Sequence, residues 1–160
     1  MLGVSLRYLK DQDLAKDLLQ DSFIKVFDKL KVYNHQGSFE GWIRRIVVNT
    51  IIDYFRKKKV EMLLLDEDDH FDGRFQAPEV EESNSNDLAS KISPEMVADA
   101  MNNLSPAYRT VFNMYVVEGY SHKEIADNLG ISVGTSKSNL AKARQRLQQM
   151  LSKKIVYTNE

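Results

Sequence analysis

The sequence predicts an all-α protein made of two small helical bundles joined by a flexible acidic linker. Apolar residues recur three or four positions apart in both halves of the 160-residue chain, the spacing of amphipathic helices. Both halves are basic: residues 1–60 hold 12 Lys and Arg against 7 Asp and Glu, and residues 100–160 hold 8 against 4. Residues 61–99 hold 2 against 12. Two basic blocks around an acidic one indicate two modules that face a polyanion, held on a solvated spacer.

The composition argues against several classes of protein. The chain has no cysteine, so it can form neither a disulfide framework nor a thiolate metal site, which suits a reducing compartment. No apolar run approaches the roughly 20 residues that span a bilayer. Arg7, Lys10 and Asp11 interrupt the apolar core that a signal peptide would need. We therefore expect a cytoplasmic protein without membrane insertion.

The first bundle is predicted over residues 1–60 and begins with two helices. Residues 1–10 form the end of an amphipathic helix, and Asp11 or Asp13 can cap a second helix that ends near Lys31. The inward stripe of this second helix is predicted to hold Leu14, Leu18, Phe23, Val26, Phe27 and Leu30. Its outward face carries Asp13, Asp17, Gln20, Asp21 and Asp28. From spacing alone this acidic face is either solvated or a binding surface.

A third helix is predicted from the cap at Ser38 to about Lys57. Apolar residues nearly surround it, which is typical of a helix in the middle of a bundle. Its main polar stripe holds Arg45, Asn49, Asp53 and Arg56, which share one face at helical spacing. The basic run at its end, which includes Lys57 and Lys58, can complement the helix dipole or bind phosphates.

The linker is predicted over residues 61–93, without lasting structure. It contains His70 directly after the acidic run Asp66–Asp69, so a metal site or a metal-dependent nuclease is an alternative interpretation. A contiguous acidic run has no fixed geometry and offers only one nitrogen ligand. We therefore expect no metal, no cofactor and no catalysis.

The second bundle is predicted over residues 94–152, with a tail over 153–160. Pro94 and Pro106 each suit the first position of a helix, and Gly119 ends the second of these helices. The inward side of that second helix is predicted to hold Tyr108, Val111, Phe112, Tyr115 and Val116.

The most informative stretch lies between residues 120 and 147. Ser121 and Glu124 form a capping box, Gly130 can end the short helix that follows, and Ser132 can cap a longer one. Two helices joined in this way are a helix-turn-helix, whose second helix enters the major groove of DNA. Its inward side is predicted to hold Val133, Leu140, Leu147 and Leu151. Its outward, DNA-binding side is predicted to hold Thr135, Lys137, Ser138, Asn139, Lys142 and Arg146. An ordinary helical hairpin with a solvated face is the alternative.

The order of the motifs DLLQDSF, GSFEGWIRRIVVNTIIDYFRKKK and GYSHKEIADNLGISVGTSKSNLAKARQRL resembles an extracytoplasmic-function sigma factor of the sigma-70 family. The resemblance covers residues 1–60 and 94–150. Family members usually carry further residues ahead of this chain's start, so we expect a truncated N-terminus. Ser136 stands where an apolar residue is usual, and Asn139 stands where Arg is common.

The resemblance implies a promoter-recognition subunit of bacterial RNA polymerase with no chemistry of its own and no small-molecule substrate. It implies that core polymerase binds Asp17, Gln20 and Asp21, and that an anti-sigma factor is a further partner. The minus-thirty-five element of promoter DNA would be read by the helix after Ser132. The minus-ten element would be bound by Arg45, Asn49, Asp53, Arg56, Lys57 and Lys58. A response-regulator-type transcription regulator is the alternative, but its receiver domain would need strands where residues 1–60 predict only helices.

Overall fold

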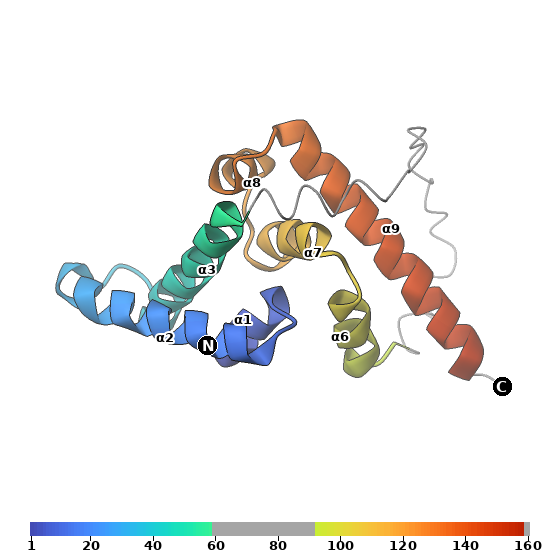
Figure 1. Ribbon diagram of the computed structural model, residues 1–160, viewed down its shortest axis with the longest axis horizontal. Coiled ribbons are helices and arrows are strands. Elements are labelled where there is room, and N and C mark those ends of the chain that lie inside the picture. The colour runs from blue at the N-terminus through green and yellow to red at the C-terminus, as the bar shows by residue number, and fades with distance from the viewer. Residues whose placement is uncertain (59–91, 159–160) are drawn as a thin grey trace.

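A computed structural model describes the backbone of residues 1–58 and 92–158, with side chains through residue 153. Every regular element in these ranges is a helix, so the predicted all-α class is confirmed (Figure 1). Most of the predicted linker, including His70, lies outside the described residues. Among the described helices, none is long and apolar enough to cross a membrane.

The N-terminal module contains α1 (Leu2–Tyr8), α2 (Gln12–Lys29), the short 3₁₀ helix η1 (Leu30–Val32) and α3 (Phe39–Lys57). Both predicted caps are present. The Asp11 carboxylate accepts hydrogen bonds from the amides of Asp13 and Leu14, and the Ser38 hydroxyl accepts one from Gly41. α3 is the central helix, as predicted, because α1, α2 and α8 all pack against it. Its buried apolar side chains are Ile46, Val47, Val48, Ile51, Ile52 and Phe55.

The inward face of α2 differs from the prediction. Phe27 is 70% exposed, and Phe23 and Leu30 are also exposed. The buried stripe instead consists of Ala15, Leu18, Ser22 and Val26. Two members of this stripe are small, and the buried Ser22 hydroxyl donates to the Leu18 carbonyl oxygen at 2.6 Å. Leu18 and Val26 are buried and Leu14 packs against the core, as predicted, so counting large apolar residues made the stripe too wide and missed its small members.

The C-terminal module contains α6 (Pro94–Asn102), α7 (Pro106–Phe112), the π-helical turn η3 (Asn113–Val117), α8 (His122–Leu129) and α9 (Val133–Thr158). Pro94 and Pro106 begin their helices, as predicted. α9 packs against α6, α7 and α8 and is the spine of the module. It runs to Thr158, so the predicted tail from residue 153 is largely a continuation of this helix.

The π-helical turn changes which side chains face inward. Tyr115 and Val116 were predicted to be buried but are exposed, whereas Asn113 and Met114 are buried in their place. A π-helical turn accommodates an extra residue, which rotates the following side chains away from the α-helical register. The prediction assumed an uninterrupted α-helix and therefore failed after Phe112.

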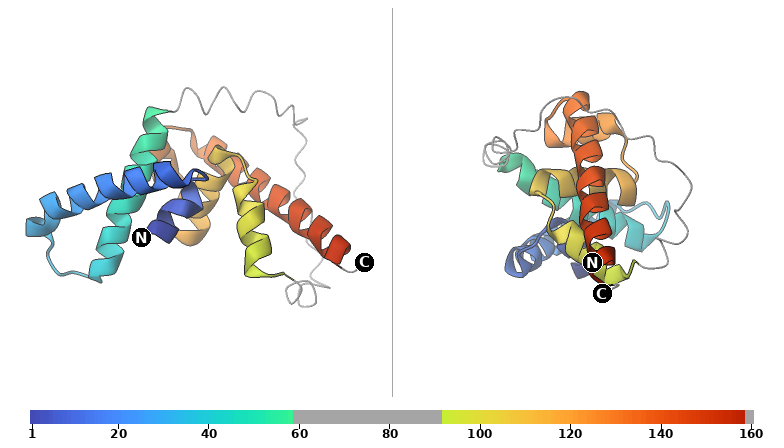
Figure 2. Two further views of the ribbon diagram at one scale, coloured as in Figure 1. Left: turned by 60° about the horizontal axis from the view of Figure 1, so that its bottom comes forward. Right: turned by 90° about the vertical axis from the view of Figure 1, so that its right-hand side faces the viewer.

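The two modules pack against each other instead of standing apart. One apolar cluster contains Val48 and Ile51 of α3 together with Met114 and Ile125 of the C-terminal module. The Asn113 side-chain amide donates a hydrogen bond of 2.8 Å to the Arg7 carbonyl oxygen, which joins η3 to α1. α2 and the C-terminal part of α9 lie at opposite ends of the molecule (Figure 2). The sequence predicted both modules but not this contact between them.

Candidate nucleic-acid interface

The helix-turn-helix has the local geometry that the sequence predicts. The Glu124 amide donates to the Ser121 hydroxyl at 3.2 Å, and the Ser121 amide donates to the Glu124 carboxylate at 2.8 Å. Gly130 has a φ of 64°, a left-handed conformation that ends α8 at little steric cost. The Ser132 hydroxyl then accepts a hydrogen bond of 2.9 Å from the Thr135 amide at the start of α9. The capping box, the turn glycine and the second cap are confirmed.

The inward face of α9 is rotated from the predicted one by about 50° at 100° per residue. Its buried residues are Ser136, Asn139, Leu140, Ala143 and Leu147. Asn139 is only 9% exposed and Val133 is 41% exposed, so the predicted positions of these two side chains are wrong. The buried Ser136 hydroxyl lies 3.0 Å from Nδ1 of His122 on α8, which gives a polar residue a partner on the packed side.

The outward face of α9 presents short polar groups flanked by cations. Lys137 and Ser138 are exposed on the first turns, and Arg146 is exposed further along. Thr135 and Lys142 are half-buried, and the Lys142 ammonium lies 5.8 Å from the centre of the Tyr108 ring. Thr135, Ser138, Lys142 and Arg146 lie on one side of the helix at 100° per residue, whereas Lys137 lies on the other flank.

Arg144 is an exposed cation that the sequence analysis did not assign. It lies 5.9 Å from the centre of the Tyr115 ring. The signal for it was present, because Arg144 follows Lys137 by seven residues and therefore lies on the same side of the helix. The rotated face thus has cations on both flanks, with Lys137 and Arg144 on one and Lys142 and Arg146 on the other.

The polar stripe of α3 is brought together as predicted. Arg45 and Asn49 are exposed, and Asp53 and Arg56 form an ion pair of 2.9 Å. Lys57 and Lys58 are exposed at the end of the helix, where the Lys58 ammonium lies 5.3 Å from the centre of the Tyr54 ring. The Asn49 amide oxygen also accepts a hydrogen bond of 3.4 Å from the Tyr120 hydroxyl of the other module.

Aromatic side chains gather around the start of α3, and the sequence analysis did not assign them to a site. The centre of the Tyr33 ring lies 5.3 Å from that of Phe39 and 5.0 Å from that of Trp42. His35 also contacts Tyr33 and has a φ of 59° in the connecting loop. Phe39 is exposed, and Tyr33 and Trp42 are half-buried. Accessible aromatic rings beside a basic helix are suited to stack on unpaired bases. The sequence did hold a signal for this cluster, because Phe39 and Trp42 are three residues apart and so share one face of a helix.

The predicted polymerase-binding residues lie on one exposed stripe of α2. Asp17, Gln20 and Asp21 are all exposed. The same stripe continues at helical spacing through Ile24, which is 59% exposed, and Phe27. Large apolar residues gain by being covered, so this stripe is a candidate binding surface.

His122 gives the helix-turn-helix a predicted pH dependence. Burial, followed by the positive charges of Lys137 and Arg144, lowers the pKa of His122 below its ordinary value of 6.5. The unfolded chain therefore binds this proton more tightly than the folded chain. Stability is complete above the unfolded pKa of about 6.5 and is lost as the pH falls from there toward the lowered folded pKa.

We expect the melting temperature of the wild type to fall between about pH 7 and pH 5, and to fall less in His122→Gln, which keeps a polar group beside Ser136 without the titration. His35→Gln removes an exposed imidazole and is the matched control. Equal pH dependence in wild type and His122→Gln, measured by circular dichroism, would contradict the prediction.

The geometry defines a class of protein: an all-helical, two-module, DNA-binding protein with a helix-turn-helix in one module and a basic, aromatic-flanked helix in the other. Among the described residues, no three His, Asp or Glu side chains are grouped so as to hold a metal ion. Comparison with known proteins places the chain more narrowly. The family described as sigma-70 region 2 matches residues 1–61, and the family described as sigma-70 region 4 matches residues 95–147.

Two curated relatives are similar along most of this chain. It is 30% identical to the extracytoplasmic-function RNA polymerase sigma factor SigM of Bacillus subtilis, over 92% of this chain and 86% of SigM. It is 31% identical to the extracytoplasmic-function sigma factor SigE of Mycolicibacterium smegmatis, over 94% of this chain but only 56% of that relative's length. The chain belongs to the sigma-70 family, among the extracytoplasmic-function sigma factors.

A solved structure supports the fold. The sigma factor RpoE of Bartonella quintana, crystallised with the anti-sigma factor NepR, superposes with a TM-score of 0.54. The match covers 94% of this chain and 89% of that one at 24% identity. This likeness bears on the arrangement of helices alone.

Proposed function

We propose that this chain directs bacterial RNA polymerase to promoters by contacting DNA with two separate helices. The outward face of α9 reads the minus-thirty-five element as a duplex, and the polar stripe of α3 binds the minus-ten element. The chain supplies binding and positioning, and the polymerase supplies the chemistry. We therefore expect it to act in the cytoplasm, where promoter DNA and polymerase are found.

The observation that carries this proposal is that one chain of the sigma-70 family has two faces suited to DNA, the outward face of α9 and the polar stripe of α3. On α9, Ser138 offers a short hydroxyl for base edges, and cations flank it for phosphates. On α3, Asn49 offers an amide that can pair with a base edge, between Arg45 and Arg56. The ring cluster of Tyr33, Phe39 and Trp42 lies at the start of the same helix and can stack on an unpaired base.

We place the polymerase contact on the exposed stripe of α2. Its carboxylates give orientation, and Ile24 and Phe27 give apolar area that becomes buried on binding. We also expect an anti-sigma factor as a regulatory partner, as the family resemblance implies. A response-regulator-type function is not supported, because residues 1–58 contain no strand from which a receiver domain could be built.

The direct test is transcription with purified components. We expect the chain and core polymerase together to initiate at a discrete set of genomic sites that share two upstream sequence elements. Core polymerase alone is the control for background initiation. Mapped transcript starts that lack shared elements, or starts identical to those of core polymerase alone, would contradict the proposal.

The polymerase-binding face gives a separate prediction. Replacing Asp17 and Gln20 by Ala should weaken binding to core polymerase and leave helicity unchanged, because both side chains are exposed. The matched control is Asp13→Ala with Gln12→Ala, which removes the same two residue types from the exposed start of α2. Competition against a labelled sigma factor measures the affinity. An unchanged affinity for the first variant would move the contact elsewhere.

A further inference from the structure

A large apolar cavity lies where α1 meets the C-terminal module. Its volume is about 590 Å³, which is within the range that holds a small-molecule ligand. α1 forms one wall, and α6, η3 and α9 form others (Figure 1). The side chains that line it are mostly aliphatic: Leu6, Val97, Met101, Val117, Leu147 and Leu151. The function proposed above uses none of the residues that line this cavity.

The cavity follows α6 along the length of that helix. Lining residues recur from Pro94 through Ala98 to Asn102, at a spacing that places them on one face. At 1.5 Å per residue this wall is about 12 Å long. The α1 wall leaves room as well, because a Cβ added at Gly3 would meet no other part of the chain within 4 Å. A straight aliphatic chain fits along such a wall.

Among the described residues that line this cavity, Arg7 carries the only charge. Its carbonyl oxygen accepts the 2.8 Å hydrogen bond from Asn113, so its backbone is fixed, whereas the residue itself is exposed. Arg7 forms no ion pair within the described part of the chain. A cation at the edge of an aliphatic cavity favours a ligand with an anionic group on an apolar body.

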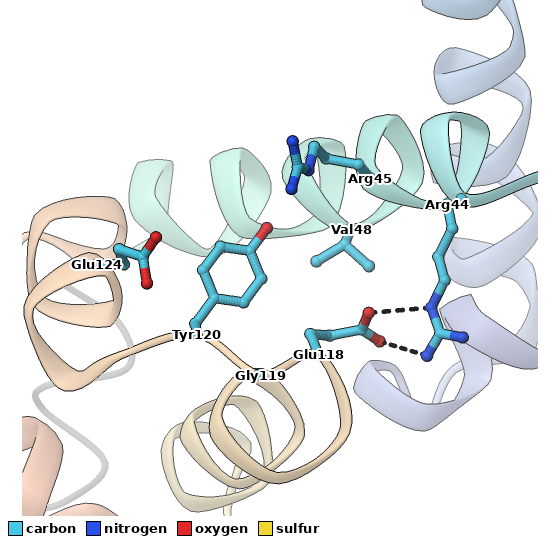
Figure 3. Close-up of a pocket in the computed structure, with 8 residues that line it drawn as sticks. Arg44, Arg45, Val48, Glu118, Gly119, Tyr120 and Glu124 are labelled. Carbon is cyan, nitrogen blue, oxygen red and sulfur yellow. Dashed lines mark hydrogen bonds and ion pairs between the residues drawn. The ribbon is translucent and has the colours of Figure 1, made fainter. Parts of the chain in front are cut away.

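A second cavity at the contact between the modules has the opposite character. Its volume is about 250 Å³, and its charged lining residues come from both modules: Arg44, Arg45, Glu118 and Glu124 (Figure 3). Nε and Nη2 of Arg44 each donate a hydrogen bond of 2.9 Å to the Glu118 carboxylate, so here the protein itself supplies the anion. The larger cavity is therefore the one whose cation is left for an anion from outside.

We propose that the cavity between α1 and α6 binds a free, medium-chain fatty carboxylate, with the aliphatic tail along α6 and the carboxylate beside Arg7. Burial of the tail supplies most of the affinity, and the charge sets the orientation. Since the walls belong to both modules, the ligand ties α1 to the C-terminal module. Binding needs neither DNA nor polymerase, so this inference goes beyond the proposed function and holds or fails independently of it.

A series of straight-chain carboxylates tests the tail. Binding of hexanoate, octanoate and decanoate to the full chain is measured by calorimetry at neutral pH, below their micellar concentrations. Each added methylene should tighten binding about threefold to fourfold. Decanoate at about ten times its Kd should raise the melting temperature by about 3–6 °C. Affinity that does not change with chain length, or uptake that does not saturate, would overturn the proposal and favour a protein surface as the occupant.

Arg7→Gln tests the charge. Only the backbone of Arg7 takes part in hydrogen bonds among the described residues, so this variant should fold normally. It should bind decanoate about three- to fivefold more weakly than the wild type does, and bind uncharged decanol equally well. Lys10→Gln removes an exposed cation that does not line the cavity and is the matched control. An equal loss in Lys10→Gln, or an equal loss for decanol, would overturn the pairing with Arg7.

Two variants that fill the cavity test its place between the modules. Gly3→Leu fills it from α1, where the added side chain has room, and Ala98→Phe fills it from the exposed face of α6. Each should abolish decanoate binding with little change in the melting temperature of the free chain. Ala141→Phe adds the same ring to α9 outside the cavity and should bind decanoate normally. Loss of binding in Ala98→Phe alone would place the site within the C-terminal module and overturn the tie to α1.

Vesicles of phosphatidylglycerol distinguish a free carboxylate from a membrane lipid. We expect the chain not to sediment with these vesicles. Sedimentation that Ala98→Phe abolishes would overturn the assignment to a free carboxylate, because the same cavity would then hold a lipid of the membrane surface.

Discussion

Shortening Ile51 to Ala should lower the free energy of unfolding by about 2–5 kcal/mol, one of the largest effects expected of a single substitution here. Ile51 is 0% exposed and lies on α3 in the apolar cluster that both modules share. Removing three carbons there loses apolar burial and leaves a cavity that close-packed neighbours fill only in part. Urea unfolding followed by circular dichroism measures the change.

The matched control removes the same atoms from the surface. Ile24→Ala should change the free energy of unfolding by no more than about 0.5 kcal/mol, because this side chain is 59% exposed. Its effect should appear in polymerase binding, where Ile24 continues the stripe of Asp17 and Gln20. Equal destabilisation by the two variants would contradict the placement of α3 at the centre of the fold. Unimpaired polymerase binding by Ile24→Ala would restrict the binding face to the carboxylates.

Local signals in the sequence predicted the helices well. Capping depends on a few adjacent residues, so Ser38, Ser121 and Ser132 could each be assigned without knowing the rest of the fold. The central position of α3 was also predictable, since a helix that is apolar nearly all round has to be covered on several sides. In the same way, Gly130 could be placed at the end of α8, because the left-handed conformation there favours glycine.

The errors arose where packing depends on a partner elsewhere in the chain. Asn139 was predicted to face outward but lies on the packed side of α9. The packed side also holds Ser136, whose hydroxyl is paired with His122 on α8. The π-helical turn after Phe112 has no periodic signature, so the exposure of Tyr115 could not be anticipated. For the candidate site, the polar stripe of α3 was predicted and found. The Arg44–Glu118 pair joins residues 74 positions apart in the sequence, which no local pattern reveals.

Replacing cations on α9 and replacing Ser138 should have different effects on DNA binding. Lys142→Ala should weaken binding to every minus-thirty-five sequence by a similar factor and reduce the salt slope by about one counterion, because a lysine on the flank of a groove-bound helix contacts phosphate. Arg144→Ala should behave in the same way from the opposite flank. Binding of holoenzyme to a set of promoters at several salt concentrations measures both quantities.

Ser138→Ala should instead change which base pair is preferred, by roughly 1–3 kcal/mol at one position, because Ser138 is exposed at the centre of the outward face. Asn139 is the neighbouring polar residue at the edge of the packed side. Asn139→Arg forces a charged side chain into a packed position and should lower the melting temperature of the protein without creating a new base preference. If the Asn139→Arg protein is stable and prefers a different minus-thirty-five sequence, the DNA-reading face includes Asn139, as the sequence analysis predicted. A uniform loss of affinity in Ser138→Ala would mean that this hydroxyl contacts the DNA backbone.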